Sequence, residues 1–214
     1  MNKELLEVYD LNGKMIDVEE RGKFYKNTKN EFTKKGKVTK KVKTIRLLLM
    51  NSKGKIVLQK RNSTKEENPN LYDKTIGGHV EEEDSYELTL IKECSEELGF
   101  PVSVLKEQDF SRAIKKTDLR IIGIFKEMDY DDKFMSERII KGTKKKIIQP
   151  VMCTFYVGYY NGPIQFIDGE SSGIQLYTLD ELKQEMKTNP NKFTNDIKVM
   201  IKKYSKYLKP INNK

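Results

Sequence analysis

The sequence contains few of the residues that most often build metal centres and disulfide frameworks. Among 214 residues there is one histidine, His79, two cysteines, Cys94 and Cys153, and no tryptophan. Two cysteines without a CxxC pair are too few for a disulfide framework, and one histidine argues against a zinc centre. A catalytic triad or metal site that requires histidine would therefore have to use His79.

Long apolar runs are also missing. The longest, at residues 47–50, is far shorter than the roughly 20 residues that a membrane-spanning helix needs. The first ten residues, MNKELLEVYD, include no apolar signal-peptide core. We therefore expect a cytoplasmic protein without a membrane partner, and its length is enough for one domain with a real core.

Positive charge is plentiful, since the formal net charge is +9. A dense basic run, TKKGKVTKKVK, extends from Thr33 to Lys43. Such a run attracts polyanions, including nucleic acid, but it also occurs as a solvated, lysine-rich edge. Because the run has no aromatic residue on which a base could stack, we favour the solvated edge and do not favour nucleic acid as a partner.

The order of predicted elements indicates an α+β fold, one sheet covered by helices. A hairpin with its turn at Asn12-Gly13 is expected at the N-terminus, and a helix over Ser85–Leu98 that Gly99 ends. Further strands are expected at 44–50, 55–61, 102–108, 118–128 and 147–160. Residues 173–186 are expected to form a strand followed by a helix capped at Thr178 or Asp180, and residues 193–208 a last helix. Residues 22–43 and 129–146 are expected to be polar, irregular stretches. We expect residues 1–43 to pack on a main domain of residues 44–214, forming one unit.

The segment KECSEELGF, at 92–100, crowds acidic residues on the predicted helix. Helical spacing places Glu93, Glu96 and Glu97 on one face, where like charges repel. Clustered carboxylates near an exposed backbone carbonyl, which Gly78 could provide, suit a hard divalent cation such as Mg²⁺ or Mn²⁺. A solvated acidic face is the alternative, and the other side of the helix carries an apolar stripe of Leu90, Ile91, Cys94 and Leu98.

Read with its flanks, this helix resembles the Nudix box, Gly-x5-Glu-x7-Arg-Glu-U-x-Glu-Glu-x-Gly-U, in which U is apolar. The spacing agrees from Gly78 to Phe100. Two positions depart from the pattern, because Asp84 replaces the first glutamate and Lys92 replaces the arginine. The resemblance implies that this pair supports the box through an ion pair. Asp84 also fits a helix N-cap with Glu87 as capping-box partner, and the two interpretations are compatible.

The resemblance covers the chain from about residue 44 and implies a Nudix-type α/β/α sandwich with a mixed central sheet, extended here by the N-terminal hairpin. It also implies a Mg²⁺- or Mn²⁺-dependent hydrolase that cleaves a diphosphate linkage in a nucleoside-diphosphate-type substrate with metal-activated water. The implied metal ligands are Glu93, Glu96, Glu97 and the Gly78 carbonyl. Glu97 or Glu93 would serve as general base, with Glu170 as a candidate outside the box. A homodimer is common among such proteins.

Four further residues are candidates for substrate binding. Lys60 and Arg61 end a strand and could donate to phosphate oxygens, or they are ordinary charged strand ends. Tyr72 could stack on a ring or pack beneath its loop, and His79 could contact substrate or hold its loop. Each alternative stays open from the sequence alone.

Two other functions are alternatives to the hydrolase. Proteins of this layout also resemble type 1 isopentenyl diphosphate isomerase, whose site needs a cysteine two residues before a metal-binding histidine. Gly77 stands at the cysteine position before His79, and no histidine lies upstream, so the isomerase is disfavoured. A Nudix domain that binds a nucleotide or RNA without hydrolysing it is the other alternative, but three retained carboxylates favour catalysis.

Overall fold

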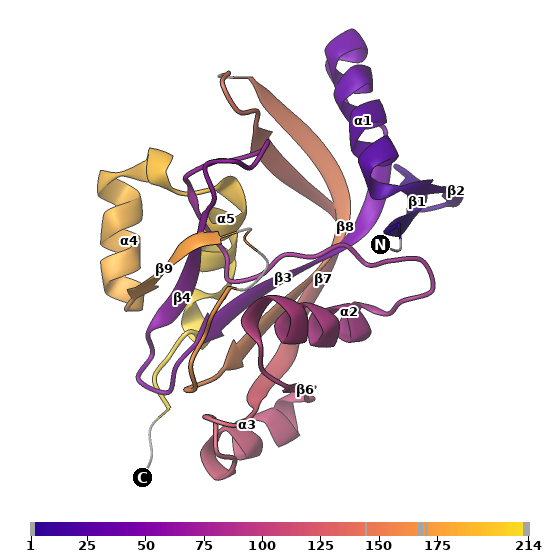
Figure 1. The fold of residues 1–214 in the computed structure, drawn as a ribbon. Helices are drawn as coiled ribbons and strands as arrows, with labels where there is room; N and C mark the ends of the chain where they lie inside the picture. The colour runs from indigo at the N-terminus through magenta and orange to yellow at the C-terminus, as the bar shows by residue number, and fades with distance from the viewer. Residues whose placement is uncertain (1–2, 144, 167–168, 170, 212–214) are drawn as a thin grey trace.

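A nine-stranded mixed sheet organises the chain, with helices on both of its faces (Figure 1). The computed structural model describes residues 3–143, 145–166, 169 and 171–211. The strands are β1 (Leu5–Asp10), β2 (Met15–Glu20), β3 (Lys40–Met50), β4 (Ile56–Arg61), β5 (Tyr72–Asp73), β6 (Val102–Val104), β7 (Gly123–Ile139), β8 (Lys146–Tyr159) and β9 (Ser171–Tyr177). The helices are α1 (Arg21–Lys35), α2 (Tyr86–Glu93), a π-helix η1 (Cys94–Leu98), α3 (Glu107–Lys116), α4 (Leu179–Thr188) and α5 (Asn195–Tyr204), with 3₁₀ turns η2 (Pro190–Lys192) and η3 (Ser205–Tyr207).

Strand β3 lies at the centre of the sheet, whose main path is β2-β1-β3-β8-β7-β6. It runs parallel to β8 along one edge and antiparallel to β1 near its start. At its end it pairs with β4, which also carries β5 and β9. The mixed sheet and the N-terminal hairpin are therefore confirmed, and Gly13 takes the positive φ of 86° that the hairpin turn needs. Strand β3 crosses the expected boundary at residue 43 without a break. The division of the chain into a segment of residues 1–43 and a main domain of residues 44–214 stays a prediction.

Two apolar cores flank the sheet and give the α/β/α layering. One contains side chains from α1, α3, α4 and α5, among them Phe24, Leu182 and Met200. The other contains Leu90, Cys94 and Leu98 from the α2 and η1 segment. These three residues were predicted to face the sheet. Ile91 was also predicted to do so, but it is 37% exposed, because the apolar stripe of the helix is narrower than expected.

Three predicted segments are wrong in structure. The basic stretch after the hairpin is helix α1, which Gly36 ends in a left-handed conformation. Only Phe24 and Thr28 of this helix are buried, so its sequence shows little apolar periodicity. Within the polar region, residues 129–139 form most of β7, which pairs with β8, instead of an irregular excursion, since cross-strand backbone hydrogen bonds do not require apolar side chains. Residues 107–116, partly assigned to a strand, form α3.

The basic run Thr33–Lys43 contributes several side chains to the interior. Lys41 is 2% exposed and donates to the backbone carbonyl of Asp132. Lys40 pairs with Glu19 at 2.8 Å, and Lys43 pairs with Glu7. The prediction of a solvated edge is therefore correct only for residues 33–37, which are exposed, and is wrong for residues 40–43, which begin the central strand β3. Within the described ranges, every helix is too short or too polar to cross a bilayer.

A buried ion-pair network joins α5 to the sheet. Arg46 of β3 contacts Asp196 of α5 at 2.8 Å, and Lys74 lies 3.4 Å from the same carboxylate. Lys74 also pairs at 3.0 Å with Asp73, which accepts a hydrogen bond from Thr194 at 2.6 Å. All of these charged side chains are at most 8% exposed. The network therefore links three segments far apart in sequence and depends on every partner being present.

The pKa values of the two carboxylates follow from this network. Burial alone would raise the pKa of Asp196, but the charges of Arg46 and Lys74 outweigh it and hold the pKa well below the ordinary 3.8. Burial would also raise the pKa of Asp73, but the positive charges of Lys74 and Arg61 have the larger effect and lower it. Lowered pKa values mean that these ionised groups stabilise the folded state above pH 3.8, and that this stabilisation is lost as the pH falls further.

We predict that Leu90→Ala lowers the free energy of unfolding by about 2–5 kcal/mol, because it leaves a cavity in the core under α2. Ile91→Ala, one residue along the same helix, is the control and should cost less than about 1 kcal/mol. Urea unfolding of both variants checks this. Equal losses would contradict the assignment of the buried helix face.

We predict that Asp196→Asn lowers the free energy of unfolding by about 3–5 kcal/mol at pH 7, because it leaves Arg46 and Lys74 without their shared carboxylate. The deficit relative to the native protein should narrow as the pH falls below about 4, because Asp196 is protonated in the unfolded state there while it stays ionised in the folded state, which favours unfolding of the native protein. Unfolding measured at several pH values between neutral and acid checks both statements. A deficit that does not change with pH would contradict the assigned ion pairs.

Candidate active site

The loop that carries Gly77 and Gly78 is fixed to the open edge of β3. The Ile45 amide donates to the Gly78 carbonyl at 2.9 Å, and the Leu47 amide donates to the Ile76 carbonyl at 3.0 Å. A side chain at Gly78 would overlap the Glu93 carboxylate, so only glycine allows the loop to come this close to the helix. The Gly78 oxygen, predicted as a metal ligand, therefore already accepts one hydrogen bond and retains one lone pair.

Helix α2 begins one residue later than the predicted capping box requires. Ser85 is its N-cap, and the Ser85 hydroxyl accepts from the Leu88 amide at 3.0 Å. The prediction of Asp84 as N-cap is therefore wrong, because a hydroxyl at the next position takes that role. Asp84 instead pairs with Lys92, whose Nζ lies 2.7 Å from its carboxylate. The pair connects the start of the helix to its last turn, which is the supporting role that the resemblance implies.

The predicted continuous helix is interrupted after Glu93. Residues Cys94–Leu98 form a π-helix, and Gly99 ends it in the left-handed conformation with a φ of 75°. A π-helical turn widens the backbone and is frequent at functional sites. Glu96 and Glu97 lie on this wider turn. Residue spacing alone does not distinguish a π-helical turn from an α-helical one, so this turn could not be predicted.

The three predicted carboxylates line one cavity of about 210 Å³, here called the acidic cavity. Glu93, Glu96 and Glu97 are joined there by Glu4, just before β1, and by Glu81 of the loop. Its other lining residues are Arg21, Gly77, Gly78 and His79. The structure thus brings the box carboxylates together as predicted. Glu4 and Arg21 were not predicted, because no pattern links the N-terminal segment to the box, and Glu81 was not predicted because it occupies an unspecified position of the box pattern.

The Glu93 carboxylate lies among other acidic side chains, and its pKa is raised. Burial, together with the charges of Glu4 and Glu96, raises the pKa of Glu93 to about 7, although a hydrogen bond with Glu97 lowers it. An all-oxygen set with surplus negative charge fits a hard divalent cation. Among the described residues, however, no three acidic, histidine or cysteine side chains already converge as a ligand set. The donors therefore fit Mg²⁺ or Mn²⁺ in kind, and side-chain rotation would have to complete their arrangement.

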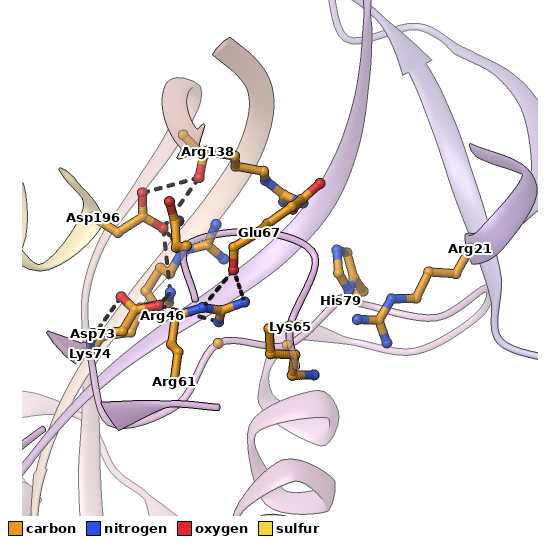
Figure 2. Close-up of a pocket in the computed structure, with 14 residues that line it drawn as sticks. Arg21, Arg46, Arg61, Lys65, Glu67, Asp73, Lys74, His79, Arg138 and Asp196 are labelled. Atoms are coloured by element: carbon orange, nitrogen blue, oxygen red, sulfur yellow. Dashed lines mark hydrogen bonds and ion pairs between the residues drawn. The ribbon is translucent and has the colours of Figure 1, made fainter. Parts of the chain in front are cut away.

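A second cavity of about 110 Å³, here called the cation cavity, adjoins the first (Figure 2). Arg46, Lys74, Asp73 and Asp196 of the buried network form part of its lining. Other lining residues come from the 61–68 loop and from β7, namely Arg61, Lys65, Glu67, Asn68, Ser136 and Arg138. The two cavities share Arg21, Gly77, Gly78 and His79. Opposite charges therefore meet along one common wall.

His79 is held at this common wall by hydrogen bonds. Its Nε2 lies 2.6 Å from the Tyr25 hydroxyl, and its Nδ1 lies 3.5 Å from Glu4. Tyr25 accepts from Arg138 at 3.0 Å, which leaves the phenolic proton for Nε2. Burial, followed by the charges of Arg21 and Arg138, lowers the pKa of His79 well below its ordinary value. The imidazole is therefore neutral, and it positions the loop as well as lining both cavities.

The remaining predicted residues separate into two groups. Arg61 lines the cation cavity, donates to the Glu67 carbonyl at 2.9 Å and lies 3.6 Å from Asp73. Lys60 and Tyr72 line neither cavity; the Tyr72 ring packs on Phe193 with centroids 5.7 Å apart. Glu170 lies outside the described residues.

The glycine at the cysteine position of the isomerase has its own structural reason. A side chain at Gly77 would overlap the end of Lys74. Lys74 is 6% exposed and is held by two carboxylates, so it has little freedom to move aside. The packing at this position argues further against an isomerase site.

Comparisons with solved structures agree with this fold. The protein DR0079 from Deinococcus radiodurans aligns over 94% of this chain and 98% of its own, with a TM-score of 0.62 and 16% identity. The MutT protein from Methanosarcina mazei aligns over 77% and 93%, with 16% identity and a TM-score of 0.45. A bifunctional NMN adenylyltransferase/ADP ribose pyrophosphatase from Francisella tularensis, complexed with AMP and Mn ion, aligns over 87% and 47%, with 16% identity and a TM-score of 0.49. The likeness to DR0079 supports the fold alone, because its identity is low.

A search by sequence against curated proteins finds no significant match. The family model of the NUDIX domain, in contrast, matches residues 40–197. This match spans more than half of the chain and includes the loop, the helix and the three box carboxylates of the acidic cavity. The chain therefore belongs to the Nudix family.

Proposed function

We propose that the chain is a Mg²⁺- or Mn²⁺-dependent hydrolase that cleaves a diphosphate linkage in a nucleoside-diphosphate-type substrate. The observation that carries this proposal is the acidic cavity, where Glu93, Glu96 and Glu97 adjoin a wall shared with a cationic cavity. A diphosphate and its cations would compensate both surpluses of charge at once. Nudix family members are pyrophosphohydrolases, which supports the reaction class.

Glu93, Glu96 and Glu97 are the residues that would hold the cation, with the free lone pair of the Gly78 carbonyl as an additional ligand. When bound, a divalent cation polarises the diphosphate oxygens and makes a nearby water more acidic. Glu4 and Glu81 line the same cavity. They supply further negative charge that favours divalent cations over monovalent ones.

The protein's own groups would then position water and substrate. The oxygen of a water molecule bonds to one phosphorus, and the bond from that phosphorus to the bridging oxygen breaks with its electrons on the leaving phosphate. A carboxylate accepts the proton that the water loses. Glu93 is one candidate for this role, because it lines the acidic cavity beside Gly78. Glu97, its hydrogen-bond partner, is the alternative.

The cation cavity would hold phosphate oxygens and keep the scissile bond in place. Arginine side chains form bidentate, charge-assisted bonds with phosphate, and Arg21 lines both cavities. Fixing the substrate in this way contributes to catalysis by removing its freedom to reorient. A protein that only bound nucleotides would not need the box carboxylates beside such a cavity.

We predict that Glu96→Gln and Glu97→Gln each lower kcat/KM for diphosphate hydrolysis by about 100-fold or more, because each removes a charged oxygen ligand of a cation that contributes several kcal/mol. Phosphate and nucleotide products are measured with Mg²⁺ and with Mn²⁺. The substrate panel comprises nucleoside diphosphate sugars, dinucleoside polyphosphates and nucleoside triphosphates.

Glu87→Gln is the matched control, since Glu87 lies exposed on α2 outside the acidic cavity and undergoes the same chemical change. It should retain the native rate. If either cavity variant keeps its metal-dependent rate, the proposed catalysis at this site is wrong. If the native protein hydrolyses no member of the panel with either metal, the hydrolase function itself is in error.

A further inference from the structure

One face of helix α1 contacts the residues that line the two cavities. Arg21, Tyr25 and Lys29 follow one another at intervals of four residues, which places them on the same side of the helix. Their partners, in the same order, are Glu4, His79 and Glu67. Each partner lines at least one cavity, so this face of α1 belongs to the surroundings of the candidate active site.

The family pattern does not specify these contacts. Helix α1 ends at Lys35, and the NUDIX model begins to match at residue 40. Arg21 and Tyr25 therefore lie outside the match, although both reach residues of the cavity wall. What α1 does at the site has to be inferred from its contacts in this chain.

The Tyr25 hydroxyl determines which nitrogen of His79 carries the proton. Nη2 of Arg138 donates to the hydroxyl oxygen at 3.0 Å, and a guanidinium cannot accept a hydrogen bond. The phenolic proton is therefore donated to Nε2 of His79, which lies 2.6 Å away. Nε2 is then the bare nitrogen of the imidazole, and the proton lies on Nδ1.

The surroundings of Nδ1 favour the same tautomer. Nδ1 of His79 lies 3.5 Å from Oε1 of Glu4, and a bare nitrogen at this place would turn its lone pair toward a carboxylate. With the proton on Nδ1, the positive end of the N–H bond faces the oxygen instead. Oε2 of Glu4 accepts from Arg21 at 2.8 Å. The Glu4 carboxylate is thus held by His79 on one oxygen and by Arg21 on the other.

Arg138 fixes the orientation of Tyr25 from the other side. Its guanidinium lies 4.7 Å from the centroid of the Tyr25 ring and pairs with Glu67 at 2.6 Å. In Figure 2, His79 lies between Arg138 and Arg21. A continuous series of contacts therefore runs from Glu67 through Tyr25 and His79 to the edge of the acidic cavity.

We propose that Tyr25 is a positioning residue of the active site. By keeping the His79 proton on Nδ1, it holds the Glu4 carboxylate in the acidic cavity with the three box carboxylates. Without the phenolic donor, a bare Nδ1 would become accessible and would turn Glu4 away from the cavity. This inference rests on the proposed function, because the cavity acts by holding a divalent cation, and it makes α1 part of the active site.

The tautomer can be measured directly, because His79 is the single histidine of the chain. Histidine labelled with ¹⁵N in its ring gives signals from His79 alone, and protonated and bare ring nitrogens are well separated in a nitrogen NMR spectrum. In the metal-free native protein we expect the proton on Nδ1. A proton on Nε2, or an equal mixture of the two tautomers, would overturn the proposal. This measurement requires neither a variant nor a substrate.

Tyr25→Phe removes the hydroxyl and keeps the ring. The form of His79 with its proton on Nε2 should then become populated. The affinity for Mn²⁺, measured by isothermal titration calorimetry without substrate, should fall about tenfold, as is typical when a group that orients the residues of a metal site is lost.

Tyr159→Phe is the matched control. The Tyr159 hydroxyl also makes a hydrogen bond of 2.6 Å, to the Lys209 carbonyl, and Tyr159 lines neither cavity. This variant should bind Mn²⁺ as the native protein does. Thermal unfolding establishes that both variants are folded, and the native tautomer decides if Tyr25→Phe is not. Equal Mn²⁺ affinities for the two variants would show that Tyr25 is merely structural and would overturn the proposal.

Hydrolysis separates this proposal from the hydrolase function. With Mn²⁺ below its native Kd, the rate of Tyr25→Phe should be about tenfold below the native rate, and saturating Mn²⁺ should restore most of it. A native protein that hydrolyses no diphosphate refutes the hydrolase, while the tautomer and the Mn²⁺ affinity still decide the role of Tyr25. Native hydrolysis with an unchanged Mn²⁺ dependence in Tyr25→Phe refutes the positioning role alone.

Discussion

The backbone hydrogen bonds between the edge of β3 and the loop of residues 75–80 determine the arrangement of the whole site. They fix Gly78 at Ile45 and so place the loop against the Glu93 carboxylate. Side chains alternate across a strand, so Ile45 and Leu47 pack in the core under α2 while Arg46, between them, reaches the opposite face and contacts Asp196. Strand β3 thereby supplies both the backbone that holds the box and the Arg46 side chain that lines the cation cavity.

Two cavities whose linings differ in charge share a wall, along which Arg21 pairs with Glu4 at 2.8 Å. In the acidic cavity, burial and neighbouring carboxylates raise the pKa of Glu93. In the cation cavity, burial would raise the pKa of Asp196, yet the surrounding cations lower it. The two shifts have opposite directions because the local surplus of charge has opposite sign. An arrangement of this kind stores electrostatic free energy, which a ligand that brings both phosphates and divalent cations can release.

The sequence predicts the box carboxylates well, because helical spacing places Glu93, Glu96 and Glu97 near one another whether the turn is α or π. It does not predict their neighbours. Glu4, Arg21 and Tyr25 come from the hairpin and α1, before residue 40 where the family match begins, and only the pairing of β1 with β3 brings them to the site. The continuation of β7 through residues 129–139 and helix α1 were missed for a related reason. Cross-strand hydrogen bonds stabilise the strand, and a few buried residues stabilise the helix. The periodicity of apolar residues in the sequence reveals neither kind of contact.

Asp84 and Lys92 depart from the box pattern at positions outside the acidic cavity. The pair keeps opposite charges at 2.7 Å with one lysine nitrogen on one carboxylate oxygen, so a bidentate arginine is not required to connect the two ends of α2. Neither residue lines the acidic cavity, and Lys92 is 42% exposed at its side chain, where an ion pair contributes little to stability. The carboxylates are instead held by Leu90, Cys94 and Leu98, which anchor the same segment in the core. Because the apolar face fixes the helix, a weaker ion pair on its exposed side leaves the acidic cavity intact.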